Sequence, residues 1–299
     1  MPEGTPQKSP EQKPIKVAQI LDGKGAESLE ASARVYELAT GDIVIAGTDK
    51  GIDYKDHNED RVVIIPKKDF IAVVDGVGGG AGGGEKAAEI LATNLSASGD
   101  ISSAAEKAQR EMFEAGLYKR DGAVFISGRI VAREGKKFLE VFQAGDAALV
   151  IIKKDNSISF ESQDDSQVRL LVETKNITPD EALYHPRRNV VFGALFAGSK
   201  TQPKTCGMIQ IDSGDLILIM SDGISDNFTA EEIAEHIKKY HLLPRQLFTW
   251  LSDTTTARMK DADEIIAKTP DRAKDGVYSD GYKSKPKPDN RALVIIEIK

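Results

Sequence analysis

The sequence predicts an α+β fold in which antiparallel sheets are covered by helices. Nine short runs rich in Val, Ile, Leu and Phe follow one another along the chain, and such runs are typical of β-strands. Several are joined by only a few turn residues, as at 66–69 and 133–137, and connections this short make antiparallel neighbours. Two amphipathic helices separate the third run from the fourth, which indicates packed sheets with helices on the outside.

The individual elements follow from these patterns. The predicted strands cover residues 42–46, 61–65, 70–74, 123–132, 138–144, 148–153, 207–211, 215–220 and 292–298. The two helices cover 85–96 and 103–118, and the second has apolar residues at helical spacing. Two later helices are expected to begin at the capping boxes TPDE (178–181) and TAEE (229–232).

Composition limits the class of protein. With 299 residues, of which 40% are hydrophobic, the chain is long enough to bury a substantial core. A net charge of −7 leaves no excess of positive charge, so we expect no nucleic-acid partner. Cys206 is the only cysteine, which excludes an internal disulfide and is compatible with a reducing cytosol. No apolar run approaches the ~20 residues of a membrane span, and the first residues lack the apolar core of a signal peptide, so we expect a cytoplasmic protein without membrane contact.

One folded domain is expected over residues 16–299. Residues 1–15 are rich in Pro, Lys, Glu and Gln and have almost nothing to bury, so they are predicted to be a disordered tail. Residues 269–289 are polar and rich in Gly, Pro and Lys, which predicts a long exposed loop before the last strand.

The stretch DGVGGGAGGG at 75–84 places an aspartate at the end of an apolar strand and a run of glycines before a helix. Glycine is costly to order, so such a run indicates either a flexible linker or a backbone that must adopt positive φ or pass close to something. Gly78, Gly80 and Gly83 fit G-x-G-x-x-G, a weak signal for a phosphate cradle. In a third interpretation, the glycines let the backbone approach whatever the carboxylate of Asp75 holds.

Acidic motifs stand beside the predicted strands, at NED (58–60), DG (75–76), SDG (221–223) and DN (289–290). An isolated Asp-Gly is most often a turn. Asp75 and Asp222, however, each follow an apolar strand, where burial would demand a counter-charge. A pair of Mg²⁺ or Mn²⁺ ions, which prefer oxygen ligands, is an economical partner for several such carboxylates.

The order of these motifs resembles that of the metal-dependent protein phosphatases (PPM, the type 2C serine/threonine phosphatases). The shared pattern runs NED, VVDGVGG, AGD, LILIMSDGISD and DN, and it extends from about residue 42 to residue 298. The segment 164–191 closely resembles the flap of the bacterial branch. The resemblance implies a four-layer αββα sandwich of two antiparallel sheets flanked by helices, with two metal ions at one end of the sheets.

The resemblance also implies the metal ligands. Asp75 would bridge both ions, the carbonyl of Gly76 would complete one site, and Asp222 and Asp289 would complete the other. Two such ions lower the pKa of a shared water and clamp the phosphoryl oxygens, so that hydroxide attacks phosphorus in line without a nucleophilic side chain. Asp75 and Asp222 are therefore the expected catalytic residues, together with Lys55.

Further acidic residues are implied around this pair. Asp60, and with it Glu59, would lie in the outer coordination shell and reach the ions through waters. Asp146 of the AGD motif matches the aspartate that, with Asp222, holds a third and weaker metal ion in many bacterial members.

The chain departs from the bacterial pattern on the substrate side. Lys55 stands where an arginine usually receives the phosphate, and it is either a point-charge phosphate contact or a solvated surface lysine. Val77 stands where eukaryotic members have a histidine, so a metal-bound water would have to protonate the leaving oxygen. Arg187 and Arg188 in the flap are candidate phosphopeptide contacts, with solvated charge as the alternative. Cys206 lacks a C-x5-R loop, which argues against a cysteine phosphatase.

Three functions follow from these observations. The leading hypothesis is a Mn²⁺- or Mg²⁺-dependent phosphatase that removes phosphate from Ser and Thr residues of proteins, opposes a Ser/Thr kinase and acts as a monomer. The second is a weakened or inactive relative that binds phosphoprotein or a regulatory partner, motivated by Lys55 and the absent histidine. The third is a nucleotide-binding protein, although the glycines are not followed by the Lys-Ser/Thr of a P-loop.

Overall fold

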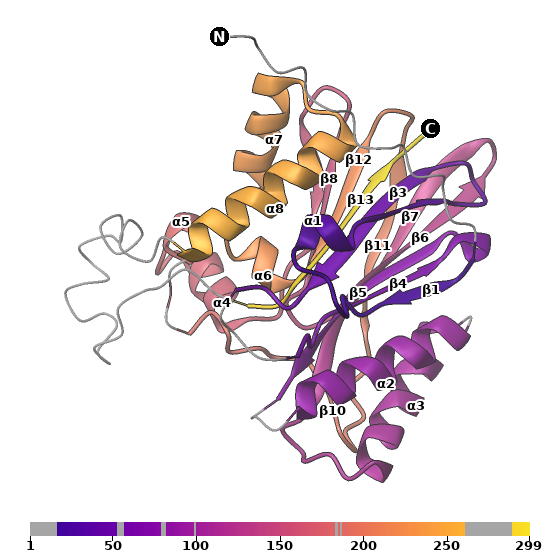
Figure 1. The fold of residues 1–299 in the computed structure, drawn as a ribbon, viewed down its shortest axis with the longest axis vertical. Helices are drawn as coiled ribbons and strands as arrows, with labels where there is room; N and C mark the ends of the chain where they lie inside the picture. Colours follow the sequence, from indigo (N-terminus) through magenta and orange to yellow (C-terminus); the bar gives the residue numbers. More distant parts are fainter. Residues whose placement is uncertain are drawn as a thin grey trace.

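The computed structural model describes residues 17–52, 57–78, 82–98, 100–182, 185, 187–260 and 289–299. The predicted tail at 1–15 and the predicted loop at 269–289, except for Asp289, lie outside these residues. Within them, two antiparallel sheets pack face to face and helices cover both outer faces (Figure 1). The predicted four-layer αββα sandwich is therefore confirmed. No helix in the described part of the chain is long and apolar enough to cross a membrane.

The two sheets draw their strands from all parts of the described chain. The first sheet has the order β1-β4-β5-β6-β7-β11, with β10 paired to β6. Its strands are β1 (Gln19–Leu21), β4 (Arg61–Ile65), β5 (Phe70–Val77), β6 (Gly122–Arg133), β7 (Lys136–Ala144), β10 (Leu195–Phe196) and β11 (Lys204–Ile211). The second sheet has the order β2-β3-β13-β12-β8-β9. Its strands are β2 (Arg34–Glu37), β3 (Ile43–Asp49), β8 (Ala148–Ile152), β9 (Ile158–Glu161), β12 (Leu216–Met220) and β13 (Arg291–Glu297).

The helices form the two outer layers (Figure 1). Helices α2 (Gly83–Ala97) and α3 (Ile101–Glu114) cover the first sheet, while α1 (Leu29–Ser32), α7 (Ala230–Tyr240) and α8 (Pro244–Lys260) cover the second. Apolar side chains fill the space between the sheets and the space beneath each helical layer. Central strands such as β4 and β13 are therefore buried on both faces, which is why their sequences are continuous apolar runs.

Strand register brings the acidic motifs to one end of the sandwich. In the second sheet, the last residue of β12 pairs with the start of both β8 and β13. In the first sheet, the start of β4 pairs with the end of β5, and β13 packs against both of these strands. The NED, AGD and DN motifs precede β4, β8 and β13, the SDG motif follows β12, and the DG motif lies within the end of β5. The aspartates that they place at this end are Asp60, Asp75, Asp146, Asp222 and Asp289.

All nine predicted strands are present, at β3 to β8 and β11 to β13. Strands β1, β2, β9 and β10 were not predicted, because runs of two to four residues are too short to show a period. Helix α8 was missed because Ser252 and Thr255 occupy buried positions on its inner face. Helix α3 ends at Glu114, earlier than predicted, and Gly116 follows with a φ of 78° that ends the helix.

The flap segment, defined here as residues 164–191, leaves the second sheet after β9 and returns to the place where it began. Ser166 pairs with Val191 in an isolated antiparallel bridge, and the Gln167 amide donates to the Val190 carbonyl at 2.9 Å. Between these ends lie the short helices α4 (Gln167–Glu173) and α5 (Pro179–Ala182). The predicted capping box at 178–181 is present, with reciprocal bonds of 2.7 and 3.1 Å. The flap segment is therefore an insertion whose two ends are hydrogen-bonded to each other.

Candidate metal centre

The glycines after Asp75 allow two pieces of backbone to meet. A Cβ placed on Gly76 would lie 2.2 Å from the carbonyl oxygen of Gly84, at the start of α2. A Cβ placed on Gly84 would lie 2.8 Å from the Gly76 carbonyl oxygen and 2.7 Å from Oε1 of Glu59. Only glycine fits at both positions, so these two glycines permit a close approach of backbone to backbone, while the interpretation that they serve a group held by Asp75 stays a prediction.

The NED motif is fixed by its own backbone and by a distant asparagine. The Asp60 amide donates to Oδ1 of Asn58 at 3.0 Å, and the Arg61 guanidinium donates to the Asn58 carbonyl at 2.6 Å. The Glu59 amide donates to Oδ1 of Asn290 at 2.9 Å, although the two residues are 231 positions apart. The turn before β4 is thereby tied to the start of β13.

The SDG motif is tied to the same two segments. The Ser221 hydroxyl donates to Oδ2 of Asp60 at 2.5 Å and accepts the Ala292 amide at 2.9 Å. A Cβ placed on Gly223 would lie 1.9 Å from the Asn290 carbonyl oxygen and 3.3 Å from Cβ of Asp289. Asp222 stands between Ser221 and Gly223 as the first residue of the short helix α6 (Asp222–Ser225). The motifs that hold Asp60, Asp222 and Asp289 are therefore in direct contact.

A buried ion pair supports the start of β13. Nε of Arg291 donates to Oδ1 of Asp49 at 2.9 Å, and a second nitrogen donates to the other carboxylate oxygen. Both side chains are almost completely buried, and Arg291 also donates to the Ser252 carbonyl and the Thr256 hydroxyl. The bidentate geometry fixes the strand directly after Asp289 and Asn290.

Asp226, the residue that ends α6, lies in a strongly acidic environment. Burial raises the pKa of Asp226 well above its usual range, the Arg188 guanidinium lowers it, and the charges of Asp146, Asp164 and Asp289 raise it again. Nε of Arg188 lies 3.5 Å from Oδ2 of Asp226. A flap residue therefore contacts the acidic end of the sandwich.

The donor set at this end suits a hard divalent cation. Asp60, Asp75, Asp222 and Asp289 offer carboxylate oxygens, and Gly76 offers a backbone carbonyl beside Asp75. Among the described residues, no three Asp, Glu, His or Cys side chains lie close enough to hold one ion by themselves. Asp75, Asp222 and Asp289, which the resemblance assigns to one shared ion, are therefore not gathered around a single point in this structure, and waters would have to complete the shell of a bound ion.

The comparisons with known proteins decide the family. The sequence model of the family described as protein phosphatase 2C matches residues 49–261. The chain belongs to the protein phosphatase 2C family. The serine/threonine protein phosphatase PstP of Mycobacterium tuberculosis is 28% identical over 211 residues, which are 64% of this chain and 38% of that protein. The chain thus matches well under half the length of this relative.

One further relative and one solved structure extend the comparison. The serine/threonine phosphatase Stp of Listeria innocua is 24% identical over 235 residues, which cover 73% of this chain and 92% of that protein. The structure of the catalytic domain of PstP in complex with two manganese ions covers 86% of this chain and 98% of its own, with a TM-score of 0.62 and 20% identity. At that identity, the structural likeness concerns the fold.

The residues predicted to contact the substrate differ in where the structure places them. Lys55 lies outside the described residues. Arg187 is exposed, whereas Arg188 is directed at Asp226, with 10% of its side chain exposed. Burial raises the pKa of Cys206, whose thiol lies 3.4 Å from Oε1 of Gln143, and a raised thiol pKa is the opposite of what a nucleophile needs.

Sequence reasoning missed several residues that organise the site. Ser221 and Asn290 were quoted within the SDG and DN motifs, yet neither was given a role. Asp226 ends the motif LILIMSDGISD and was also left unassigned. His57, which precedes the NED motif, was given no role, and its Nε2 lies 3.4 Å from Oε1 of Glu59. Their adjacency to the acidic motifs was the signal that could have identified them.

Proposed function

We propose that this chain hydrolyses phosphoserine and phosphothreonine in proteins with two Mn²⁺ or Mg²⁺ ions. Asp75, the Gly76 carbonyl, Asp222 and Asp289 would hold the ions. The observation that carries the proposal is the contact of the NED, SDG and DN motifs through Ser221 and Gly223, which gathers oxygen donors at one strand end. Membership of the protein phosphatase 2C family and the two manganese ions in the PstP catalytic domain support it.

The bound ions would supply a hydroxide nucleophile from water and electrostatic stabilisation of the phosphoryl oxygens. The protein would supply position. The hydrogen bond from Ser221 restricts rotation of the Asp60 carboxylate, and Asn290 fixes the backbone of Glu59. Both residues would thereby be held where their carboxylates can meet waters of the outer shell. The buried Arg291–Asp49 pair holds the strand that carries Asp289.

Three further residue roles belong to the proposal. Asp146 would share a third, weaker metal ion with Asp222. Lys55 would hold the substrate phosphate as a point charge, and Arg187 would contact the phosphoprotein from the exposed side of the flap. The pairing of Arg188 with Asp226 favours a role for Arg188 in holding the flap over one in binding phosphate.

The opposing kinase, the cellular compartment and the oligomeric state are inferred from the proposed function. Phosphoprotein substrates imply a Ser/Thr kinase that produces them, and we infer that the chain opposes such a kinase in the cytoplasm as a monomer. Light scattering of the purified chain tests the monomer, and co-expression with a candidate kinase followed by phosphoprotein staining tests the opposition.

Turnover measurements test the central proposal. We expect hydrolysis of p-nitrophenyl phosphate and of a phosphothreonine peptide only with added Mn²⁺ or Mg²⁺. Asp222→Ala should lower kcat/KM by at least about 100-fold, since the ions contribute several kcal/mol and each ~1.4 kcal/mol is tenfold. Asp253→Ala, an exposed aspartate of α8, is the matched control and should retain activity. Absence of metal-dependent turnover, with retained phosphopeptide binding, would instead indicate an inactive phosphoprotein-binding relative.

A further inference from the structure

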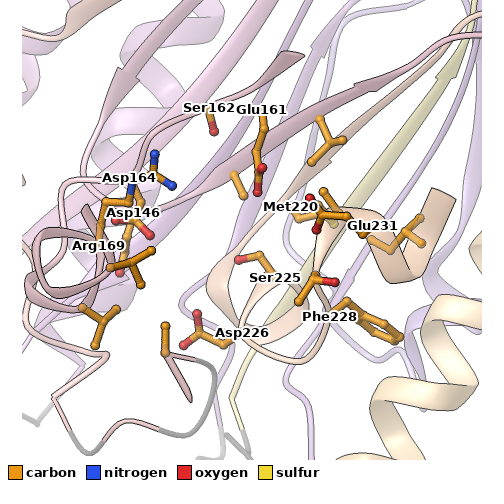
Figure 2. A pocket seen from close by; sticks show the side chains of 18 residues that line it. Asp146, Glu161, Ser162, Asp164, Arg169, Met220, Ser225, Asp226, Phe228 and Glu231 are labelled. Atoms are coloured by element: carbon orange, nitrogen blue, oxygen red, sulfur yellow. The ribbon is translucent and has the colours of Figure 1, made fainter. Parts of the chain in front are cut away.

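A cavity of about 200 Å³ lies beneath the flap segment, beside the candidate metal centre (Figure 2). Its walls come from α4 and α5 of the flap, from β8 and β9 of the second sheet, and from the turn between α6 and α7. The volume is more than ten times the ~10–15 Å³ that one water molecule needs. The cavity therefore has room for a side chain of another molecule.

The wall of this cavity contains both apolar and acidic side chains (Figure 2). Its larger apolar side chains are Val150, Val168, Val172, Met220, Phe228 and Ile233. Its carboxylates are Asp146, Glu161, Asp164, Asp226 and Glu231. A ligand that fits both kinds of side chain has an aliphatic body and a positive end.

Two of the five carboxylates are assigned a positive partner, while Asp164 accepts the uncharged amide and hydroxyl of Ser166 at 3.1 and 2.8 Å. Asp146 belongs to the proposed third metal site, and Asp226 lies 3.5 Å from the Arg188 guanidinium. We therefore count neither of them toward the charge of the cavity. The remaining three carboxylates, Glu161, Asp164 and Glu231, then determine which ligand the cavity suits.

The remaining carboxylates outnumber the positive charges in the wall. Among the described residues that line the cavity, Glu161, Asp164 and Glu231 are accompanied by one cationic side chain, Arg169. That cation is already matched, because Nε of Arg169 donates to Oε1 of Glu173 at 3.0 Å. The first turn of α7 adds only about half a positive charge, and Glu231 lies within that turn. Burial raises the pKa of Glu161 and of Asp164 above the ordinary value, and the cavity retains an excess of acidic over basic groups.

A long cationic side chain suits this wall better than a bare metal ion. Lysine and arginine bury their aliphatic stems against apolar surface and direct the charged group at carboxylates or water. Charge and shape therefore both point to a basic residue.

The position of the cavity relates it to the phosphorylated residue. The Asp226 amide donates to the Asp222 carbonyl at 2.9 Å, so the cavity wall begins one turn of α6, or about 6 Å along the helix axis, from the metal ligand. An extended peptide advances about 3.3–3.6 Å per residue. A peptide with its phosphate at the metal centre would thus reach the cavity with a side chain about two or three residues away.

We propose that this cavity is a specificity pocket for a lysine or arginine of the substrate protein, two or three residues from the phosphoserine or phosphothreonine. This proposal rests on the proposed phosphatase function and adds the class of substrate sequence that it selects. Because α4 and α5 form part of the wall, the bound side chain would contact both the flap and the second sheet.

A peptide series tests the proposal. The parent peptide is a dye-labelled phosphothreonine nonapeptide of alanines, and each further peptide carries one arginine, lysine or glutamate within three residues of the phosphothreonine. We expect at least one basic position to raise kcat/KM about tenfold, the size of one close charge pair. The double variant Glu161→Gln, Glu231→Gln should lose this preference and keep its activity on p-nitrophenyl phosphate, which has no side chain to place in the cavity.

Two further variants keep the result interpretable. Glu89→Gln with Glu114→Gln removes the same net charge from exposed positions of α2 and α3 and should keep the preference, which separates the cavity from the overall charge of −7. Ala148→Arg introduces a cation from the cavity wall itself and should abolish the preference. The proposal is wrong if no basic position is favoured or if the double glutamine variant retains the preference.

The same peptides distinguish failure of the pocket from failure of the phosphatase function. If neither p-nitrophenyl phosphate nor any peptide is hydrolysed, the phosphatase proposal fails, and fluorescence anisotropy of the labelled peptides then tests the cavity alone. At least one of the basic peptides must bind the parent chain about tenfold more tightly than the alanine peptide, and the double variant must bind these two peptides equally. Equal binding of both peptides by the parent chain would overturn the pocket.

Discussion

The candidate metal centre and the flap segment are neighbours, but their backbones are held in place in different ways. In the metal centre, side chains bond to the backbone of distant strands, as Ser221 does to Ala292 and Asn290 does to Glu59. The flap is closed by one isolated bridge at its base and contacts the acidic end through Arg188 and Asp226. Segments with few buried contacts open at lower free energy than core strands. The proposed chemistry therefore lies on the more firmly held part, whereas the proposed specificity pocket lies between that part, which carries Glu161 and Glu231, and the flap, which carries Arg169.

Removal of the buried arginine should have the largest effect on the rigid part. Arg291→Met leaves Asp49 buried without its bidentate partner, and breaking such a pair costs about 3–5 kcal/mol. Urea denaturation followed by circular dichroism should show this loss in the free energy of unfolding. Arg245→Met is the control, because its pair with Glu30 is largely exposed and is worth about 1 kcal/mol or less. Equal losses in the two variants would contradict the rigid support assigned to β13.

Loss of the serine hydroxyl should weaken metal binding without unfolding the chain. Ser221→Ala removes the donor to Asp60 and the acceptor of the Ala292 amide. Groups that orient the ligands of a metal typically contribute about 10–100-fold in affinity, and we expect the lower end, about tenfold, because Asp60 would reach the ions through waters. Isothermal titration of Mn²⁺ measures the effect. Ser225→Ala, on the same short helix, removes only a long bond of 3.4 Å to the Ser221 carbonyl and should bind Mn²⁺ almost normally. Unchanged affinity in Ser221→Ala would remove the orienting role.

The contrast between the two regions also explains what could be predicted. The nine longer strands and the acidic motifs were found because strand pattern and motif order are local in the sequence. The roles of Ser221 and Asn290 were not found, because their hydrogen bonds span 161 and 231 positions and leave no periodic trace. The cavity was missed for the same reason, since its wall combines Glu161 of β9 with Glu231 of α7.

A variant in the flap should sharpen the difference in rigidity. Arg188→Met removes the cation beside Asp226, and a partly buried pair lies between the ~0–1 kcal/mol of exposed pairs and the 3–5 kcal/mol of buried ones. We expect amide hydrogen exchange in α4 to accelerate about tenfold, while exchange in β12 and β13 stays the same. Arg187→Met should leave exchange unchanged, because Arg187 is exposed. If Arg187 contacts the phosphopeptide, KM rises in that variant alone. Uniform acceleration in α4 and the strands would contradict a separately held flap.

The smallest effect at neutral pH concerns a tyrosine in the rigid core. Tyr36 is fully buried between the sheets, and its hydroxyl has no hydrogen-bond partner among the described residues. Burial raises the pKa of Tyr36 to about 12, against a smaller lowering by Arg34. The folded chain therefore keeps this proton after the unfolded chain, with an ordinary pKa near 10, has lost it. Its contribution to stability is complete below pH 10 and is lost as the pH rises toward 12.

Tyr36→Phe removes both the buried hydroxyl and this titration. At pH 7 the free energy of unfolding should stay the same or rise by about 1 kcal/mol, because a buried hydroxyl without a partner is unfavourable. Between pH 10 and 12 the parent chain should lose up to about 1.4 kcal/mol per pH unit more than the variant. Urea denaturation at pH 7 and at intervals from pH 9 to 11.5 measures both effects. Tyr240→Phe is the control, because an exposed phenol is solvated in both states, and parallel pH curves for all three chains would show that Tyr36 ionises without cost to the core.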